Sequence, residues 1–253
     1  MAVTGQDIIN DVRALVIEPL PAFYTDARLL TLINLAQYDL VRRSRILECM
    51  AKTSTVNLQA TYSLPGNFLG SLKVYFNDQQ GGINSWIPLQ GMSVEKMSQQ
   101  YPNFLNTVIT SAQFPLNYFF IGNKINLFPT PYLKNPTTNA FDEVSPVANN
   151  LAMIYECMPT KLSVVTDPID IDPSLVDGIR AWVLWRVWMQ DNEEQKSMMW
   201  KAEFEAEVGR ARAWKKLRQL DSRTSIDVES WTGPSYIGWS ASNSQFGTSP
   251  LEL

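Results

Sequence analysis

Residues 117–131 read NYFFIGNKINLFPTP, a stretch that predicts a β-hairpin. Two runs rich in aromatic and aliphatic residues flank the dipeptide Gly-Asn, which suits a tight two-residue turn because such turns need positive φ. Side chains along each strand alternate between its two faces, and here both faces are apolar. We therefore expect one face to pack inside the chain and the other to become buried against other copies of the chain or another protein. The residues predicted for that contact are Tyr118, Phe119, Phe120, Ile121 and Phe128.

The strand pattern extends to both sides of this hairpin and predicts a β-rich region over residues 51–165. In GSLKVYFND, Leu72, Val74 and Phe76 recur at every second position, as on one face of a strand. LAMIYECMP predicts a further strand. SVEKMSQQY predicts a short helix with Ser93 as its N-cap.

Helical patterns precede this region. In TGQDIINDVRALV, Thr4 and Asp7 have the spacing of a capping box. A second helix is predicted from a Thr25 cap to about residue 50, with apolar residues three and four apart and polar residues such as Asn34 mainly between them. The two helices form a predicted helical hairpin over residues 4–50.

A second helical hairpin is predicted over residues 166–220. Asp172 is a natural N-cap and Pro173 suits the first helical position. The helix that follows has almost no polar face, so we expect it to be buried nearly all round. The last helix has a single apolar stripe. Its first half is rich in Glu and its last part in Lys and Arg, a distribution that matches the helix dipole.

Residues 221–253 differ from the rest of the chain because they are rich in Ser and Gly. Such a segment has too little contiguous apolar surface to fold alone. Its aromatic side chains favour a tail that becomes ordered on a partner, with a disordered terminus as the alternative. The predicted docking residues are Trp231, Tyr236, Trp239 and Phe246.

Together these patterns predict an α+β fold, with a helical bundle core of two helical hairpins, a β-rich insertion and an extended C-terminal tail. The predicted segments are 4–50, 51–165, 166–220 and 221–253.

The composition, with 45% apolar and 18% charged residues and a net charge of −4, is that of a globular protein without a general affinity for nucleic acid. Arg42, Arg43 and Arg45 form the densest basic cluster before the last helix. No apolar run has the length of a membrane span, and the N-terminus lacks the features of a signal peptide. Cys49 and Cys157 are far apart, so we expect two buried thiols in a reducing compartment and neither a disulfide framework nor a zinc site.

The chain contains no histidine. It therefore has no Ser-His-Asp triad, Cys-His pair or HExxH motif, and an enzyme built on it would have to use carboxylates, Lys or Tyr. We predict no catalytic, cofactor-binding or metal-binding residue.

Three residue groups suggest chemistry, yet each has a simpler structural explanation. The aspartates lack the Gly and Glu of an EF-hand and suit a strand exit and a helix cap. The glutamates suit a solvated helix face better than a pair of hydrolytic carboxylates. The tryptophans suit packing between helices better than a ligand pocket. These groups are Asp167, Asp170 and Asp172; Glu193, Glu194, Glu203, Glu205 and Glu207; and Trp182, Trp185, Trp188, Trp200 and Trp214.

The order of these parts resembles the head-to-tail adaptor (connector) proteins of tailed bacteriophages, including the tail tubular protein A and gp4-type accessory proteins of short-tailed phages. The resemblance covers about residues 4–220 and lies in TDARLLTLINLAQYDLVRR, YSLPGNFLGSLKVYFND, GNKINLFPTP and MIYECMPTKLSVVTDPIDIDPSLVDGIRAWVLWRVW. It implies a structural virion protein that forms a ring, usually of twelve copies, beneath the portal protein. The ring extends the channel for double-stranded DNA, which passes without sequence-specific binding.

The resemblance also implies the partners and the location of the chain. The portal protein is the implied partner of residues 221–253, and tail or nozzle proteins dock elsewhere on the ring. The implied location is the neck or tail of the virion, after assembly in the host cytoplasm, with no membrane and no cofactor. Two alternatives remain: another neck or tail-tube component, and a carboxylate-dependent virion-associated hydrolase.

Overall fold

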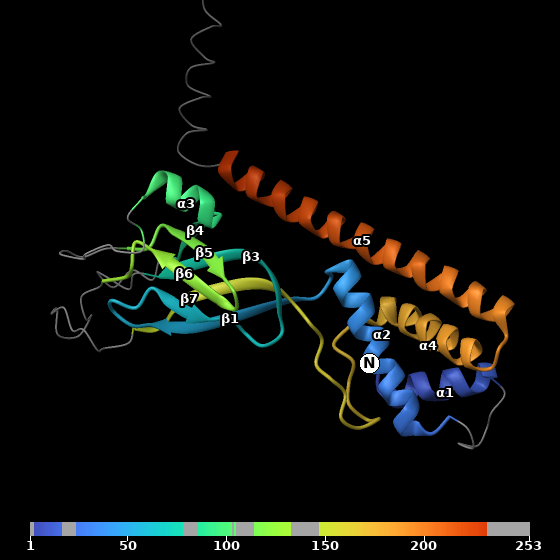
Figure 1. Cartoon of the computed structure of the whole chain (residues 1–253). Helices are drawn as coiled ribbons and strands as arrows, with labels where there is room; N and C mark the ends of the chain where they lie inside the picture. The colour runs from blue at the N-terminus through green and yellow to red at the C-terminus, as the bar shows by residue number, and fades with distance from the viewer. Residues whose placement is uncertain are drawn as a thin grey trace, which may run out of the picture. The chain divides into compact units, whose positions relative to one another are not determined.

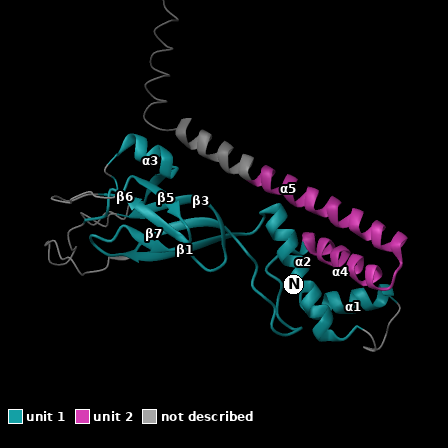
Figure 2. Ribbon diagram, in the orientation of Figure 1, with its two compact units in different colours: residues 1–173 teal, residues 174–253 magenta. Residues whose placement is uncertain are grey.

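The computed structural model describes residues 3–16, 24–77, 86–102, 104, 114–132 and 147–231, with side chains described as far as residue 218. The chain divides into two compact units, residues 1–173 and residues 174–253 (Figure 2). It contains helices and a curled mixed sheet, which confirms the predicted α+β class.

Helix α1 (Gly5–Val16) begins as predicted. The N–H of Thr4 donates to the Asp7 carboxylate (2.8 Å), and the N–H of Asp7 donates to the Thr4 hydroxyl (3.4 Å), which completes the capping box. The backbone hydrogen bond, followed by that from the Thr4 hydroxyl, lowers the pKa of Asp7. The negative charge at this helix N-terminus is therefore held in place by its own cap.

Helix α2 (Asp26–Ser44) begins at its predicted cap, where the Thr25 hydroxyl accepts a hydrogen bond from the N–H of Arg28 (3.3 Å). It ends sooner than predicted. Arg45 adopts a left-handed conformation (φ 56°) and its N–H donates to the carbonyl of Val41, which closes the last turn. The residues that follow form a strand rather than a sixth helical turn.

Asn34 lies on the buried side of α2, so its predicted place between the apolar positions is wrong. The residue is 6% exposed. Its side-chain oxygen accepts from the N–H of Leu162 (2.8 Å), and its amide nitrogen donates to the carbonyl of the same residue (3.0 Å). The apolar periodicity of a helix indicates which side of it is apolar. It does not indicate that a segment far along the chain, here at Leu162, covers the polar residue Asn34.

Unit 1 also contains a seven-stranded sheet, most of whose strands are labelled in Figure 1. The strand order is β1-β7-β3-β4-β5-β6-β2. Neighbouring strands of the sheet are antiparallel except for β4 and β5, which are parallel. The consecutive strands β1 and β2 form its two edges. The strands are β1 (Glu48–Thr55), β2 (Thr61–Ser63), β3 (Phe68–Asn77), β4 (Trp86–Gly91), β5 (Asn117–Ile121), β6 (Lys124–Phe128) and β7 (Val147–Cys157).

A disulfide joins Cys49 of β1 to Cys157 at the end of β7, so the prediction of two free thiols is wrong. The antiparallel pairing of these strands brings the two Cα atoms to 5.8 Å, within the range that a disulfide requires. The cysteines are separated by 108 positions in the sequence. The pairing of β1 with β7 brings the two cysteines together, and no local sequence motif predicts this disulfide.

Unit 2 contains two helices, α4 (Val176–Gln190) and α5 (Glu194–Trp231), which pack against each other. The chain enters α4 through the 3₁₀ turn η2 (Pro173–Leu175), so the α-helix begins later than predicted. Leu175 occupies the N-cap position without a side-chain hydrogen bond, and Asp172 precedes the 3₁₀ turn. Such turns are common at α-helix starts, and proline suits the first turn of either helix type.

Helix α5 is longer than the sequence pattern predicts. It continues past residue 220 to Trp231, so the first part of the predicted extended tail is helical. Serine and polar residues lower helix propensity only slightly, and the segment follows directly from a long helix that needs no new nucleation.

Candidate functional site

The predicted hairpin consists of β5 and β6, paired from Asn117 with Phe128 to Ile121 with Lys124. The turn between them places positive φ at Gly122 (57°), its first central position. This is the pattern of a type II′ turn, which suits the twist of the strands. The hairpin itself is therefore predictable from the sequence.

One face of the hairpin lies in the main core of the sheet. Tyr118, Ile125 and Leu127 are buried there with Val74 and Phe76 of β3. Alternation along β3 and along the hairpin points these side chains to the same side of the sheet. The predicted internal face is confirmed.

The other face is covered by helix α3 (Val94–Gln100), whose predicted cap Ser93 accepts from the N–H of Lys96. Met97 is fully buried against Phe119 and Phe128.

The rings of Tyr101, at the end of this helix, and of Phe104, just after it, also pack on this face of the hairpin. The Tyr101 ring lies 4.7 Å from the Phe128 ring, and the Phe104 ring meets the Phe119 ring edge-on at 5.4 Å. Both apolar faces of the hairpin are thus covered by residues of this chain. The second face therefore does not need another protein to bury most of its apolar side chains.

The exposed part of the hairpin is its tip. Ile121 is 50% exposed, and Phe120 is partly covered by contacts with Phe68 and Tyr118. Sequence reasoning missed the cover because it treated 93–101 as a separate short helix. The apolar spacing of Met97 and the aromatic residues after it was the available signal.

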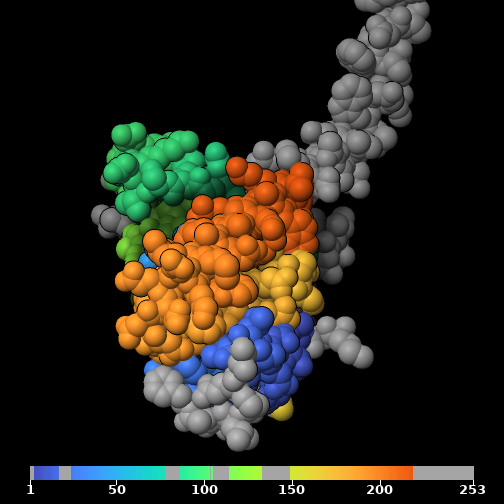
Figure 3. Space-filling model, turned by 90° about the vertical axis from the view of Figure 1, so that its right-hand side faces the viewer, coloured from blue at the N-terminus to red at the C-terminus, as the bar shows by residue number. Residues whose placement is uncertain are grey.

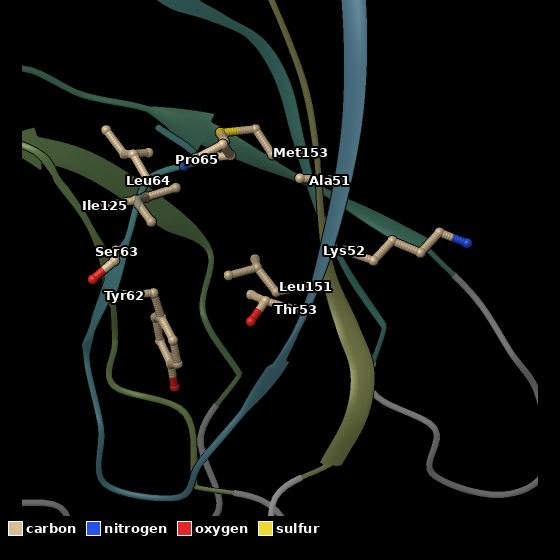
Figure 4. Close-up of a pocket in the computed structure, with 10 residues that line it drawn as sticks. All are labelled: Ala51, Lys52, Thr53, Tyr62, Ser63, Leu64, Pro65, Ile125, Leu151 and Met153. Atoms are coloured by element: carbon tan, nitrogen blue, oxygen red, sulfur yellow. The ribbon is translucent and has the colours of Figure 1, made fainter. Parts of the chain in front are cut away.

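A pocket of about 210 Å³ lies in unit 1 between the edge strands β1 and β2 (Figure 4). Its volume exceeds the roughly 150 Å³ cavity that holds benzene in an engineered protein core. Sequence reasoning did not find it, because two strand edges that are not hydrogen-bonded to each other form its walls. Its lining residues are Ala51, Lys52, Thr53, Tyr62, Ser63, Leu64, Pro65, Ile125, Leu151 and Met153.

Tyr62 anchors one end of this pocket. Its hydroxyl donates to the carbonyl of Gln59 (2.7 Å) and accepts from the N–H of Val56 (3.1 Å), which ties β2 to the loop after β1. Burial raises the pKa of Tyr62 to about 12, so the hydroxyl stays protonated near neutral pH. This geometry indicates a structural hydroxyl rather than a catalytic one.

Trp185 packs between the two helices α4 and α5, as predicted for this group of tryptophans. Trp182 is buried on α4, its ring lies 6.0 Å from that of Trp185, and the Trp185 ring stacks on Phe204 of α5. The guanidinium of Arg186 lies 4.3 Å from the centre of the Trp185 ring. Lys196 lies 4.2 Å from the ring centre of Trp188, so cations rather than a ligand cover these aromatic faces.

The aspartates before α4 hold turns. Asp167 accepts from the N–H groups of Ser163 (2.7 Å) and Val164 (2.9 Å), and these backbone hydrogen bonds lower its pKa. Asp170 accepts from the N–H of Thr160 (2.8 Å). Within the described part of the chain, no group of three or more Cys, Asp or Glu side chains has the arrangement of a metal site.

Glu207 departs from the prediction of a solvated acidic face. It is 2% exposed and forms an ion pair with Arg210 one helical turn further on. Burial is the largest cause that raises its pKa, and the charge of Arg210 acts in the opposite direction. The other glutamates of this group, Glu193, Glu194, Glu203 and Glu205, are exposed.

The predicted docking tail is described only at its start. The backbone of Trp231 ends α5, and nothing of its side chain is described. Tyr236, Trp239 and Phe246 lie outside the described residues.

Among the helices that the structure describes, none has the length and apolar character needed to cross a membrane. A family model described as SU10 adaptor protein matches residues 3–232. No curated protein matches the chain. The match extends through both compact units and stops near the end of α5. The chain therefore belongs to the SU10 adaptor protein family, a family of structural bacteriophage adaptor proteins.

Proposed function

We propose that this protein forms a ring that joins the portal to the tail of a bacteriophage particle and extends the DNA channel. The observation that carries the proposal is the adaptor family model, which matches residues 3–232 and so includes all the helices and strands described above. The proposed location is the neck of the virion, reached after assembly in the host cytoplasm.

The proposed domain organisation keeps the four predicted segments. Residues 4–50 and 166–220 supply the two helical hairpins, and residues 51–165 form a β-rich insertion. Residues 221–253, whose first part continues helix α5, reach the portal in this proposal. The insertion contains the hairpin and its tip, and it faces tail or nozzle proteins in this proposal.

Two surfaces serve as docking sites in this proposal. The tail contacts the portal through its aromatic side chains, because large rigid aromatic groups contribute much of the binding energy of protein interfaces. The hairpin tip contacts a neighbouring subunit or a tail protein through its exposed isoleucine. The proposed portal contacts are Trp231, Tyr236, Trp239 and Phe246, and the proposed tip contacts are Phe120 and Ile121.

The charge of the chain suits a passage for DNA. The net charge is −4, so the ring as a whole does not attract phosphate groups strongly. Double-stranded DNA passes through the lumen without sequence-specific binding in this proposal.

The test is the mass of the full-length protein, measured alone and mixed with the portal protein of its phage. A ring-sized complex with the portal is the expected result. The double variant Trp239→Ser and Phe246→Ser should join the portal at least about tenfold more weakly, because interface aromatics each contribute on the order of 2 kcal/mol. Absence of any portal complex with the unaltered chain would remove the ring proposal. An assay for peptidoglycan hydrolysis would then test the hydrolase alternative, and another neck or tail-tube component would stay open.

A further inference from the structure

The charges of α5 are separated along its length. Residues 193–207 carry five Glu and two Lys, whereas residues 208–218 carry five Arg or Lys and no acidic residue. The two segments meet in the middle of one continuous helix. A helix with one acidic half and one basic half presents two complementary surfaces.

The helix dipole does not account for this separation. Its influence falls off within the first and the last turn of a helix. Because α5 continues to Trp231, its last turn contains no basic residue and the basic segment lies well inside the helix. The explanation that the sequence suggested therefore applies only to Glu194 in the first turn.

Ion pairs within α5 do not account for the separation of charges along the helix either. Arg210 pairs with Glu207, and Lys196 lies 3.8 Å from Glu193. These ion pairs each join residues three positions apart. They change neither the excess of Glu before residue 208 nor the excess of Arg and Lys after it.

Part of the surface of α5 is drawn in orange in Figure 3. Exposed residues of both charged halves lie on one side of this helix. Residues separated by four or seven positions fall on the same side of an α-helix. One exposed row with this spacing carries two glutamates and one lysine in its first half and only basic charges in its second half, and it includes Met198, which is 68% exposed. The charged residues of the row and this methionine are Glu194, Met198, Lys201, Glu205, Arg212 and Lys216.

We propose that the acidic half of α5 in one copy of this chain contacts the basic half of α5 in a second copy. The partner is a second copy because the two complementary surfaces are both present on every chain. Met198 and its neighbour Met199 supply exposed apolar area in the acidic half. The proposal rests on the self-association proposed above and names the surface that makes it.

The arrangement restricts how two copies meet. Parallel helices aligned side by side would place acidic half against acidic half, which is unfavourable. Neighbouring copies must therefore stagger α5 head to tail, as in a ring whose helices run obliquely, or place two helices antiparallel. In a ring the contact repeats, so each copy uses its acidic half on one side and its basic half on the other.

Charge exchange in the full-length protein tests the contact. The first variant is Glu194→Lys with Glu205→Lys, and the second is Arg212→Glu with Lys216→Glu. In the first variant the exposed row carries only basic charges, and in the second variant four of its five charged residues are acidic. At low salt, each variant alone should need an at least about tenfold higher protein concentration than the unaltered chain to reach half-assembly. In about 0.5 M salt this difference in concentration should be smaller, because salt screens the charges strongly.

An equimolar mixture of the two variants should assemble again, because every contact between unlike variants joins opposite charges. The control matched to the first variant is Glu48→Lys with Glu95→Lys. It makes the same change in net charge as that variant, at exposed positions of unit 1, and should assemble normally. Circular dichroism of each variant checks that the helices are intact.

Two results would overturn the inference while the ring proposal stands. In one, the unaltered chain assembles and both α5 variants assemble equally well. In the other, the single variants fail and their mixture does not recover. Failure of the unaltered chain to assemble, alone or with portal protein, would instead remove the ring proposal together with this contact.

Discussion

The side chain of Asn34 satisfies both backbone groups of Leu162, with distances of 2.8 Å from the N–H nitrogen to the asparagine oxygen and 3.0 Å from the amide nitrogen to the carbonyl. One amide side chain on α2 thus fixes the segment that follows β7. Gln37 extends the link, because its amide donates to Asn34 (2.8 Å) and to the carbonyl of Thr160 (3.1 Å). These buried side chains hold the segment after β7 against α2.

Replacement of Asn34 by Leu should lower the free energy of unfolding by about 2 to 4 kcal/mol, because two buried backbone groups lose their partners. Chemical denaturation measures the change. The control is Asn10→Leu at an exposed position of α1, where an effect within about 0.5 kcal/mol is expected. Equal effects at the two positions would show that the Leu162 contacts do not stabilise the fold.

The disulfide provides a second prediction. Mass spectrometry after alkylation without reductant should find Cys49 and Cys157 unmodified and linked. The double variant Cys49→Ser and Cys157→Ser should have a free energy of unfolding about 2 to 4 kcal/mol lower than that of the unaltered protein, because the bridge closes a long loop in the unfolded chain. Reductant should destabilise the unaltered protein and leave the variant unchanged. Alkylation of both cysteines in the native, unreduced protein after denaturation would contradict the bridge.

Local patterns predicted the parts of this fold that depend on neighbouring residues. The capping box of Thr4 and Asp7, the Thr25 and Ser93 caps and the turn at Gly122 all follow from residues a few positions apart. Their hydrogen bonds form within one turn of the chain, so the sequence contains the whole interaction.

The parts that sequence reasoning missed depend on distant residues. The burial of Asn34 depends on Leu162, which is far along the chain, and the disulfide requires the pairing of β1 with β7. The pocket beside Tyr62 needs the two sheet edges to approach each other. The docking role of the C-terminal tail stays a prediction, and Trp231 marks where the description of the chain ends.

The cover of the hairpin by α3 gives a third prediction. Met97 is fully buried against Phe119 and Phe128, so Met97→Ala should cost about 2 to 5 kcal/mol of unfolding free energy. Val94 lies in the same helix and is 40% exposed, and Val94→Ala should cost less than about 1 kcal/mol. Hydrogen exchange should show faster exchange in β5 and β6 for the Met97 variant alone. Unchanged exchange in both strands would mean that α3 does not protect the hairpin.

Glu207 gives a prediction about pH. Its pKa in the folded protein is raised above the ordinary value of 4.5, mainly by burial, so the folded state binds the proton more tightly than the unfolded state does. The protonated carboxyl therefore contributes stability that is fully present below pH 4.5 and is lost as the pH rises through the folded pKa. Glu207→Gln keeps the shape of the side chain and removes the titration. Its free energy of unfolding, measured by denaturation from pH 4 to pH 7, should fall less with rising pH than that of the unaltered protein. The control Glu48→Gln changes an exposed glutamate of unit 1 and should follow the unaltered profile. If the Glu207→Gln and unaltered profiles were parallel across that range, burial would not govern the protonation of this carboxyl.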